Sequence, residues 1–99
     1  MSKVLAGFEN HGGRTKLGSG ERPLGRVLKG YGNDGRSGFE GVRRGNVIGT
    51  YLHGPLLPKN AWFADWLIAT ALSIDGPLIP LDDQLEEAAH AEARHAAGL

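Results

Sequence analysis

Short apolar and β-branched runs, separated by glycine-rich turns, fill the first half of the chain. Val4–Glu9 is the first run, and it is too apolar for the alternation of a half-exposed strand, so we expect a strand inside a sheet. A second strand is predicted around Arg26–Tyr31, before the turn signal Gly32–Gly35. Of the 16 glycines, all but Gly76 and Gly98 lie at or before residue 54. Strands and tight turns are therefore predicted for the first half, and helices for the second.

A β-hairpin is predicted next, and a histidine follows it. Phe39–Arg43 and Asn46–Leu52 are strand-like runs that flank the short turn Arg44-Gly45. The second run leads directly into His53, and Gly54-Pro55 breaks the strand immediately afterwards. This pattern places His53 at the end of the second arm, and strand ends are where α/β proteins commonly carry reacting groups. The alternative is an ordinary histidine at a strand end.

The second half begins with an amphipathic helix. It is predicted over Ala61–Ser73, with Asn60 as its N-cap and Gly76-Pro77 as its stop. Its apolar positions recur at the spacing of one helix face. We interpret this face as core packing; it consists of Phe63, Trp66, Leu67, Thr70, Ala71 and Ile74.

A second, Ala-rich helix is predicted toward the C-terminus. Asp83 and Glu86 match a capping-box-like start, and the helix is expected to run toward Ala97 and to pack weakly on the domain. His90 and His95 are five residues apart, which is the wrong spacing for a metal-binding pair on one helix face. We therefore expect both histidines to be solvated.

Composition narrows the functional classes. Ninety-nine residues allow one small domain or part of one, and such a chain buries roughly 60–70% of the surface that it exposes when unfolded. Eleven Lys and Arg residues balance 11 Asp and Glu residues without a basic block, so a nucleic acid is not an expected partner. The N-terminal apolar run is too short for a signal peptide. The most hydrophobic stretch later in the chain is interrupted by Asp65, so it does not predict a membrane span. We expect a cytoplasmic protein with no membrane span.

The chain contains no cysteine, and this limits its chemistry. It cannot form a disulfide or a Cys-based metal site, and it cannot supply its own thiol nucleophile. Phosphate-loop, dinucleotide and H-E-x-x-H patterns do not occur, and neither Ser19 nor Ser37 lies in a G-x-S-x-G elbow. We expect no cofactor and no metal. His53 is thus a candidate base whose nucleophile must come from elsewhere: a missing segment, a partner chain or the substrate.

The loop Asn10–Thr15 places two glycines beside a histidine and an arginine. In one interpretation Gly12-Gly13 supplies positive φ angles for a turn, while His11 and Arg14 are solvated. In the other the loop lines a site, because the backbone amides of the Gly-Gly turn together with Arg14 can hold a carboxylate. The residues alone leave both interpretations open.

Several segments, in a fixed order, resemble a known family. They are Gly7–Thr15, Gly30–Asn33, Glu40-Gly41 and Gly45–Asn60. They resemble the C-terminal half of the cobyric-acid-synthase-like class I glutamine amidotransferases, over about Val4 to Leu72. The most similar branch contains the amidotransferase subunits that work with a Mur-ligase-like subunit to amidate the peptidoglycan precursor lipid II. The residues that follow the histidine favour that branch.

The resemblance implies a glutaminase in which His53 is the base and a cysteine is the nucleophile. That cysteine has no counterpart here, which implies that the chain is inactive alone. Many class I members complete a triad with a glutamate two residues after the histidine, but that position is Pro55 here. Glu9 or another carboxylate is then a candidate to orient His53 from a neighbouring strand; alternatively, Glu9 is a structural acid at a strand end. The implied substrate-binding or site-lining residues are Glu9, His11, Gly12, Gly13, Arg14, Tyr51 and Gly54.

The implied fold is α/β, the C-terminal portion of a flavodoxin-like class I glutamine amidotransferase domain. It is expected over residues 1–76, with a β-rich first half followed by one or two helices, and residues 77–99 are expected to form a linker and an Ala-rich C-terminal helix or tail. A partial domain of this kind exposes a sheet edge and an uncovered face, so we expect a homo-oligomer when the chain is isolated.

The resemblance also implies partners. They are glutamine as the small-molecule substrate, a Mur-ligase-like synthetase subunit and a missing Cys-bearing N-terminal segment. Two alternatives stay open. The chain could belong to an enzyme that amidates cobyric acid or cobyrinate, or it could be a non-catalytic interaction module in which His53 is a relic.

Overall fold

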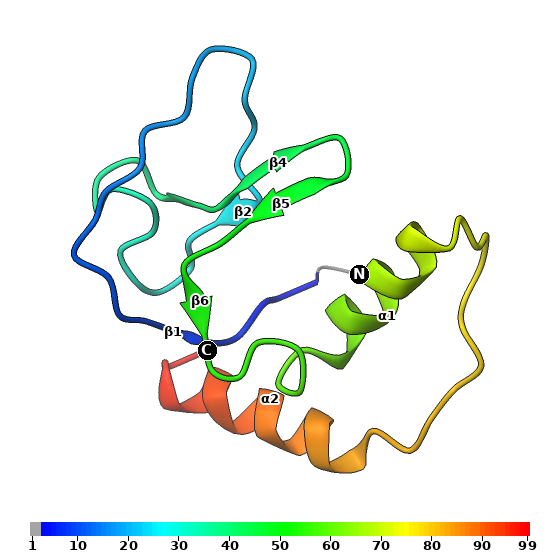
Figure 1. Ribbon diagram of the computed structural model, residues 1–99. Coiled ribbons are helices and arrows are strands. Elements are labelled where there is room, and N and C mark those ends of the chain that lie inside the picture. The colour runs from blue at the N-terminus through cyan, green and yellow to red at the C-terminus, as the bar shows by residue number, and fades with distance from the viewer. Residues whose placement is uncertain (1–2) are drawn as a thin grey trace. The chain divides into compact units, whose positions relative to one another are not determined.

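The computed structural model describes residues 3–99 as three short antiparallel strand pairs and two helices (Figure 1). The chain divides into two compact units. Phe8–His53 forms one, the strand unit, and the residues through Gly7 together with Gly54–Leu99 form the other, the helical unit. This arrangement confirms a small α/β chain with a β-rich first half followed by two helices. A flavodoxin-like sheet and a boundary at residue 76 stay predictions.

All the described strands lie in the strand unit and pair in twos. β1 (Phe8–Glu9) pairs with β6 (Leu52–His53), β2 (Gly25–Arg26) with β3 (Phe39–Glu40), and β4 (Val42–Arg44) with β5 (Val47–Gly49). In the first pair, Phe8 lies opposite His53 and Glu9 lies opposite Leu52. The pair therefore joins the start of the unit to its end.

Two of the predicted strands are shorter than expected. The strand predicted over Val4–Glu9 is confined to β1, because the backbone N–H and C=O of Ala6 both bond the Asn60 side chain instead of a neighbouring strand. Among residues 3–99, β1 has a single partner strand and leaves Phe8 54% exposed, which contradicts its predicted place inside a sheet. The strand predicted over Arg26–Tyr31 ends at Arg26, because the Tyr31 N–H donates to the Glu9 carboxylate.

The predicted hairpin is confirmed as β4 and β5, but His53 does not lie on its second arm. Gly45, with φ 59°, lies in the turn between the two strands. β5 ends at Gly49 because the Glu40 carboxylate accepts both the Thr50 hydroxyl and the Tyr51 N–H. The chain then enters β6, so pairing with β1 positions His53.

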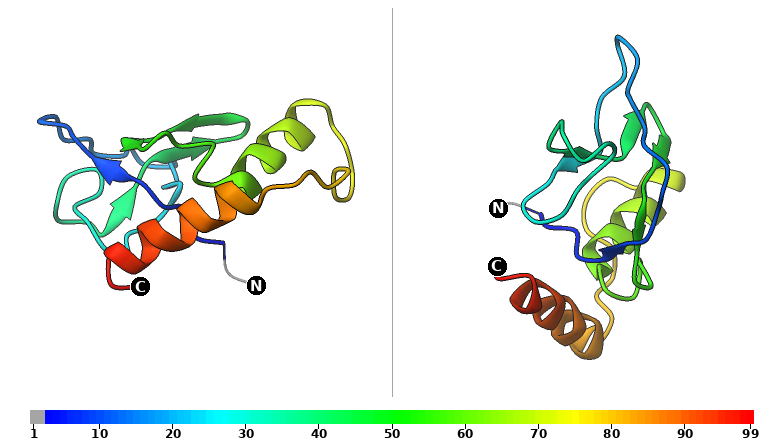
Figure 2. Two further views of the ribbon diagram at one scale, coloured as in Figure 1. Left: turned by 90° about the horizontal axis from the view of Figure 1, so that it is seen from below. Right: turned by 90° about the vertical axis from the view of Figure 1, so that its left-hand side faces the viewer.

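The helical unit contains α1 (Ala61–Ala71) and α2 (Gln84–Ala96), joined by a long open connection (Figure 2). Both helices confirm the predicted segments. Phe63 is 3% exposed and its ring packs between those of Trp62 and Trp66, with centroids 5.4 and 5.9 Å away. The predicted core stripe is wrong at Ala71 and Ile74, which are exposed, because α1 ends at Ala71 and the chain turns away after it.

Asn60 directly precedes α1, but its side chain makes no capping hydrogen bond. The residue is fully buried. Its Oδ1 accepts the Ala6 N–H at 2.7 Å, and its Nδ2 donates to the carbonyl oxygens of Ala6 and Leu56 at 2.7 and 2.8 Å. Asn60 is therefore the N-cap residue of α1, as predicted, but its side chain does not cap the helix, because it holds the N-terminal segment against the start of α1.

The start of α2 also differs from its prediction. Asp83 makes no side-chain cap, and the Gln84 N–H donates instead to Asp82 Oδ1 at 3.2 Å. The expectation of a solvated His90 is wrong, because its Nδ1 lies 2.8 Å from the Lys59 carbonyl oxygen and 3.2 Å from Asn60 Oδ1. His95 is exposed, as expected. Among residues 3–99, neither helix is long and apolar enough to span a bilayer.

Candidate functional site

His53 ends β6, and its side chain is exposed. The imidazole stacks on the Phe8 ring from the opposite strand, with centroids 5.6 Å apart and an interplanar angle of 23°. Within residues 3–99, neither ring nitrogen of His53 has a hydrogen-bond partner. The ring is thus held by one face, and both nitrogens are open to a group from outside this part of the chain.

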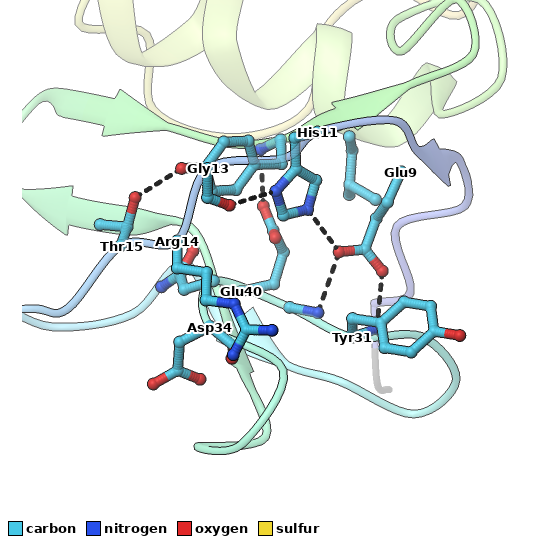
Figure 3. Close-up of polar contacts among 12 residues, drawn as sticks. Glu9, His11, Gly13, Arg14, Thr15, Tyr31, Asp34 and Glu40 are labelled. Carbon is cyan, nitrogen blue, oxygen red and sulfur yellow. Dashed lines mark hydrogen bonds and ion pairs between the residues drawn. The ribbon is translucent and has the colours of Figure 1, made fainter.

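Glu9 does not orient His53, contrary to the sequence-based expectation. It lies opposite Leu52, and successive side chains of a strand point to opposite faces, so Glu9 and His53 point away from each other. The carboxylate instead collects three donors (Figure 3): Oε2 accepts the Tyr31 N–H at 2.7 Å, and Oε1 accepts the Gly32 N–H at 2.9 Å and His11 Nε2 at 3.0 Å. Glu9 therefore joins β1 to the loop at Gly32.

The His11 side chain is largely enclosed, so the interpretation of His11 as a solvated residue is wrong. Its side chain is 14% exposed. Nδ1 lies 2.8 Å from the carbonyl oxygen of Gly13, and Nε2 lies 3.0 Å from Glu9 Oε1 (Figure 3). One face of the ring stacks on Tyr51, with centroids 3.7 Å apart and an angle of 6° between the planes. The ring is fixed at both nitrogens and on one face.

The pairing of Glu9 with His11 favours the charged form of both. The hydrogen bond to Glu9, followed by the one to the Gly13 carbonyl, raises the pKa of His11 above its usual value, with smaller contributions from the charges of Glu9 and Glu40. Burial raises the pKa of Glu9, but the hydrogen bonds from His11, Tyr31 and Gly32 together outweigh burial, so its pKa is lowered.

Tyr51 is held at its hydroxyl and at its backbone. Its hydroxyl lies 2.6 Å from Thr15 Oγ1, and its N–H donates to Glu40 Oε2 at 2.8 Å. The same carboxylate oxygen accepts the Thr50 hydroxyl at 2.6 Å, and Thr50 Oγ1 in turn accepts the Leu52 N–H at 3.1 Å. Each of the three residues before His53 therefore makes a hydrogen bond to Glu40 or to Thr50, and these bonds fix the path of the chain into β6.

Sequence reasoning missed Glu40 and Asn33 as members of this site. Glu40 is 8% exposed, and its second oxygen, Oε1, is buried without a hydrogen-bond partner among residues 3–99. Asn33 is 3% exposed and exchanges two hydrogen bonds with the Gly41 backbone, at 2.7 and 2.9 Å. The available signal was a carboxylate between Phe39 and Gly41 in a strand-like run, where a charge needs a specific partner.

The Gly-Gly loop has a different backbone from the one expected. Neither Gly12 nor Gly13 adopts a positive φ angle, so that interpretation of the turn is wrong. A Cβ at Gly12 would meet open space, whereas one at Gly13 would lie 3.6 Å from the Tyr51 hydroxyl. Arg14 is exposed and donates to the Asp34 carbonyl oxygen at 3.3 Å (Figure 3).

The structure thus brings Glu9, His11, Gly13 and Tyr51 together in one hydrogen-bonded and stacked group. Gly54 belongs to the helical unit, where a Cβ would lie 3.5 Å from the Lys59 side chain and 3.6 Å from Gly7 Cα. Residues 3–99 contain no group of three or more His, Cys, Asp or Glu side chains that could hold a metal ion.

Comparison with known families adds the decisive observation: residues 1–61 match the CobB/CobQ-like glutamine amidotransferase domain. The chain belongs to this family. The match includes His53 and the whole strand unit. The family resemblance carried by the sequence motifs is therefore confirmed.

The proteins similar to this chain include two lipid II isoglutaminyl synthase subunits and a probable cobyric acid synthase. The glutamine-hydrolyzing lipid II isoglutaminyl synthase subunit GatD of Staphylococcus aureus (strain N315) is 45% identical over 86 residues, 84% of this chain and 35% of that protein. GatD of Streptococcus pneumoniae (strain ATCC BAA-255 / R6) is 52% identical over 72 residues, 73% of this chain and 28% of that protein. A probable cobyric acid synthase of Methanothermobacter thermautotrophicus is 48% identical over 52 residues, 52% of this chain and 10% of that protein.

The aligned fraction of this chain and the aligned fraction of the relative differ between the GatD proteins and the cobyric acid synthase. The chain spans about a third of the length of the GatD proteins that it matches and a tenth of the cobyric acid synthase. The alignments to the GatD proteins, in contrast, extend over a larger part of this chain than the alignment to the synthase.

Proposed function

We propose that this chain supplies the histidine base of a glutaminase whose cysteine nucleophile lies on another segment. The ammonia released from glutamine would pass to a Mur-ligase-like synthetase that amidates lipid II. The observation that carries the proposal is the placement of His53: the ring is exposed, stacked on Phe8 and without a hydrogen-bond partner among residues 3–99, in a family member that has no cysteine of its own.

The chemistry follows from what an imidazole and a thiol do together. His53 takes the proton of the cysteine thiol, and the thiolate attacks the side-chain amide carbon of glutamine. The imidazolium then gives its proton to the departing nitrogen, so ammonia leaves and a glutamyl thioester is formed. Water, activated by the same imidazole, cleaves the thioester to glutamate and restores the thiol. In this proposal the Cys-bearing segment completes an α/β domain of the flavodoxin-like kind.

The residues grouped around His11 are proposed to border the glutamine site, which Glu9 supports through its hydrogen bond to His11 because its side chain points away from His53. Glu9, His11, Gly13 and Tyr51 lie together in the strand unit, and Gly12 and Arg14 belong to the same exposed loop. Gly54, directly after His53, is part of the same motif. Their proposed role is to shape the site, since His53 alone carries the proton transfer.

The relatives favour the lipid II branch over corrinoid amidation. The alignments to the two GatD proteins cover 84% and 73% of this chain, whereas the alignment to the cobyric acid synthase of Methanothermobacter covers 52%. Similarity to GatD therefore extends further along the chain than similarity to the synthase. A Mur-ligase-like synthetase is accordingly proposed as the partner that receives the ammonia.

The test is ammonia release from glutamine by this chain mixed with a cysteine-bearing N-terminal segment of a GatD relative. Wild-type chain is compared with His53→Ala, and His95→Ala serves as the matched control because His95 is exposed on α2. A general base contributes typically about 10²–10⁴-fold to a rate, so release should fall by about that factor in His53→Ala and stay unchanged in His95→Ala.

The outcomes separate the proposal from its rivals. Folding of each variant is checked by circular dichroism, and association with the Cys-bearing segment by sedimentation. An associated, folded wild-type mixture that releases no ammonia would refute the glutaminase role and support a non-catalytic interaction module. Release that persists in His53→Ala would place the base on another residue.

A further inference from the structure

His11 has an acceptor at each of its two ring nitrogens. The Gly13 carbonyl oxygen lies 2.8 Å from Nδ1, and the Glu9 carboxylate oxygen lies 3.0 Å from Nε2 (Figure 3). A carbonyl oxygen cannot donate a hydrogen bond, and neither can an ionised carboxylate. A neutral imidazole carries one N–H. At one of the two contacts, the lone pair of the unprotonated ring nitrogen would then face a lone pair of the acceptor oxygen, and the two would repel each other. Both hydrogen bonds form together only when the ring is doubly protonated.

We propose that His11 is an imidazolium at neutral pH and that it positions His53 by holding Tyr51. The second half of this proposal rests on the proposed function, since it assigns His11 a task in the placement of the base. His11 itself is a positioning residue, because both of its nitrogens are occupied within the chain.

The contact to Tyr51 is of the kind that a cation strengthens. The two rings lie face to face with centroids 3.7 Å apart and planes within 6° of parallel. A positive charge over the face of a tyrosine ring is attracted by the negative potential of that face. The tyrosine hydroxyl is held by Thr15 at the same time, so the ring is confined at its face and at its tip.

The charged groups around the ring agree with a fixed cation. Glu9 from β1 contacts His11 directly, and the charge of Glu40 from β3 also favours the protonated ring. Glu40 in addition accepts the Tyr51 N–H, so both carboxylates act on the His11–Tyr51 pair. The hydrogen bonds raise the pKa of His11, which is consistent with the protonation that the two acceptors require.

The pair acts on His53 through the paired strands β1 and β6. His11 follows β1 by two residues, and Tyr51 immediately precedes β6. The His11–Tyr51 stack lies at one end of this strand pair, and the Phe8–His53 stack lies at the other. Loosening the first stack frees β6 to shift along β1, and such a shift displaces the His53 ring.

Nitrogen NMR of the full 99-residue chain tests the charge of His11. Ring nitrogens of the intact chain are observed at neutral pH, and the signals that disappear in His11→Phe identify the residue. We expect two protonated nitrogens with equivalent, imidazolium-type shifts, and a titration midpoint above the ordinary value for histidine. One protonated and one unprotonated nitrogen at neutral pH would overturn the imidazolium assignment.

The positioning role is tested on the same samples without any activity. A nuclear Overhauser contact between the rings of Phe8 and His53 is expected in the wild type and in the control His95→Phe. It should weaken in His11→Phe, which keeps an aromatic face for Tyr51 but loses both hydrogen bonds and the charge. An undiminished contact in folded His11→Phe would show that stacking alone places His53, and would refute the role of the charge.

Kinetics of the mixture with the Cys-bearing segment give the functional readout. His11→Phe should lower kcat by about 10-fold, because a misplaced base impairs the chemical step, whereas a change in KM would report on the separate proposed role of His11 beside the glutamine site. Glu9→Gln should have a similar effect, and the double variant should be no worse than either single one. Additive losses would refute a shared role. A wild-type mixture without activity would refute the proposed function, while the NMR results still decide the charge of His11 and its effect on His53.

Discussion

Replacing Asn60 by alanine is the most severe single change that the structure predicts for the helical unit. The amide side chain is fully buried and serves three backbone groups: the Ala6 N–H, the Ala6 carbonyl and the Leu56 carbonyl. Alanine leaves all three without a partner. A buried polar group that loses its hydrogen bond costs about 1–3 kcal/mol, and with partial rehydration we expect a total loss of about 4 kcal/mol.

That loss is large compared with the stability of a small chain. Domains of this size are stable by roughly 5–15 kcal/mol, so Asn60→Ala should remove a large part of the free energy of unfolding. With a urea dependence of about 1–3 kcal/mol per molar, a loss of about 4 kcal/mol should lower the unfolding midpoint by roughly 1–4 M. The fluorescence of Trp62 and Trp66 reports on the transition, because both rings pack against Phe63 on α1.

Two further variants make the Asn60 experiment specific. Asn10→Ala removes an exposed amide and should change the free energy of unfolding by no more than about 0.5 kcal/mol. Asn60→Asp keeps an acceptor for the Ala6 N–H but has no donor for the two carbonyls when ionised. The loss of unfolding free energy in Asn60→Asp, relative to wild type, should therefore become smaller as the pH falls and the carboxyl gains a proton. If Asn60→Ala unfolds at the same urea concentration as Asn10→Ala, the reasoning from buried hydrogen bonds is refuted.

Two other predictions concern the strand unit. The stabilisation from a lowered pKa at Glu9 is lost as the pH falls below 4.5, and that from a raised pKa at His11 is lost as the pH rises above 6.5. The difference in unfolding free energy between wild type and His11→Phe should therefore be widest between these values, and a difference that does not vary with pH would contradict the pairing. Gly30→Ala should destabilise by about 1–3 kcal/mol, because φ is 130° and the new Cβ would lie 2.6 Å from Glu9 Oε2. Gly35→Ala is the matched control, since φ is also positive there but the space is open, and equal urea midpoints for the two variants would refute the clash.

Features that depend only on neighbouring residues were predictable from the amino-acid sequence. The periodicity of Phe63, Trp66 and Leu67 predicted α1, because the spacing of apolar side chains on one helix face is a local property. The strand-like runs on both sides of Gly45 predicted the hairpin for the same reason. The motifs that end at His53 were sufficient to identify the family, which the comparison confirmed.

The tertiary structure decided which polar groups meet across long stretches of chain. The buried Asn60 side chain bonds the Ala6 backbone, 54 residues earlier, and makes no capping hydrogen bond to α1. The Glu9 carboxylate bonds the Tyr31 backbone, 22 residues later, and therefore does not orient His53.

The same reason explains why Glu40 was missed and why the sequence left two interpretations of His11 open. Glu40 bonds Thr50 and Tyr51, 10 and 11 residues later, and His11 stacks on Tyr51, although its ring nitrogens contact the nearby Glu9 and Gly13. The cost of burying a polar group selects distant partners only once the chain is folded. Local pattern thus predicted that His53 ends a strand, but not which strand pairs with it. Only the folded structure determined what holds it there.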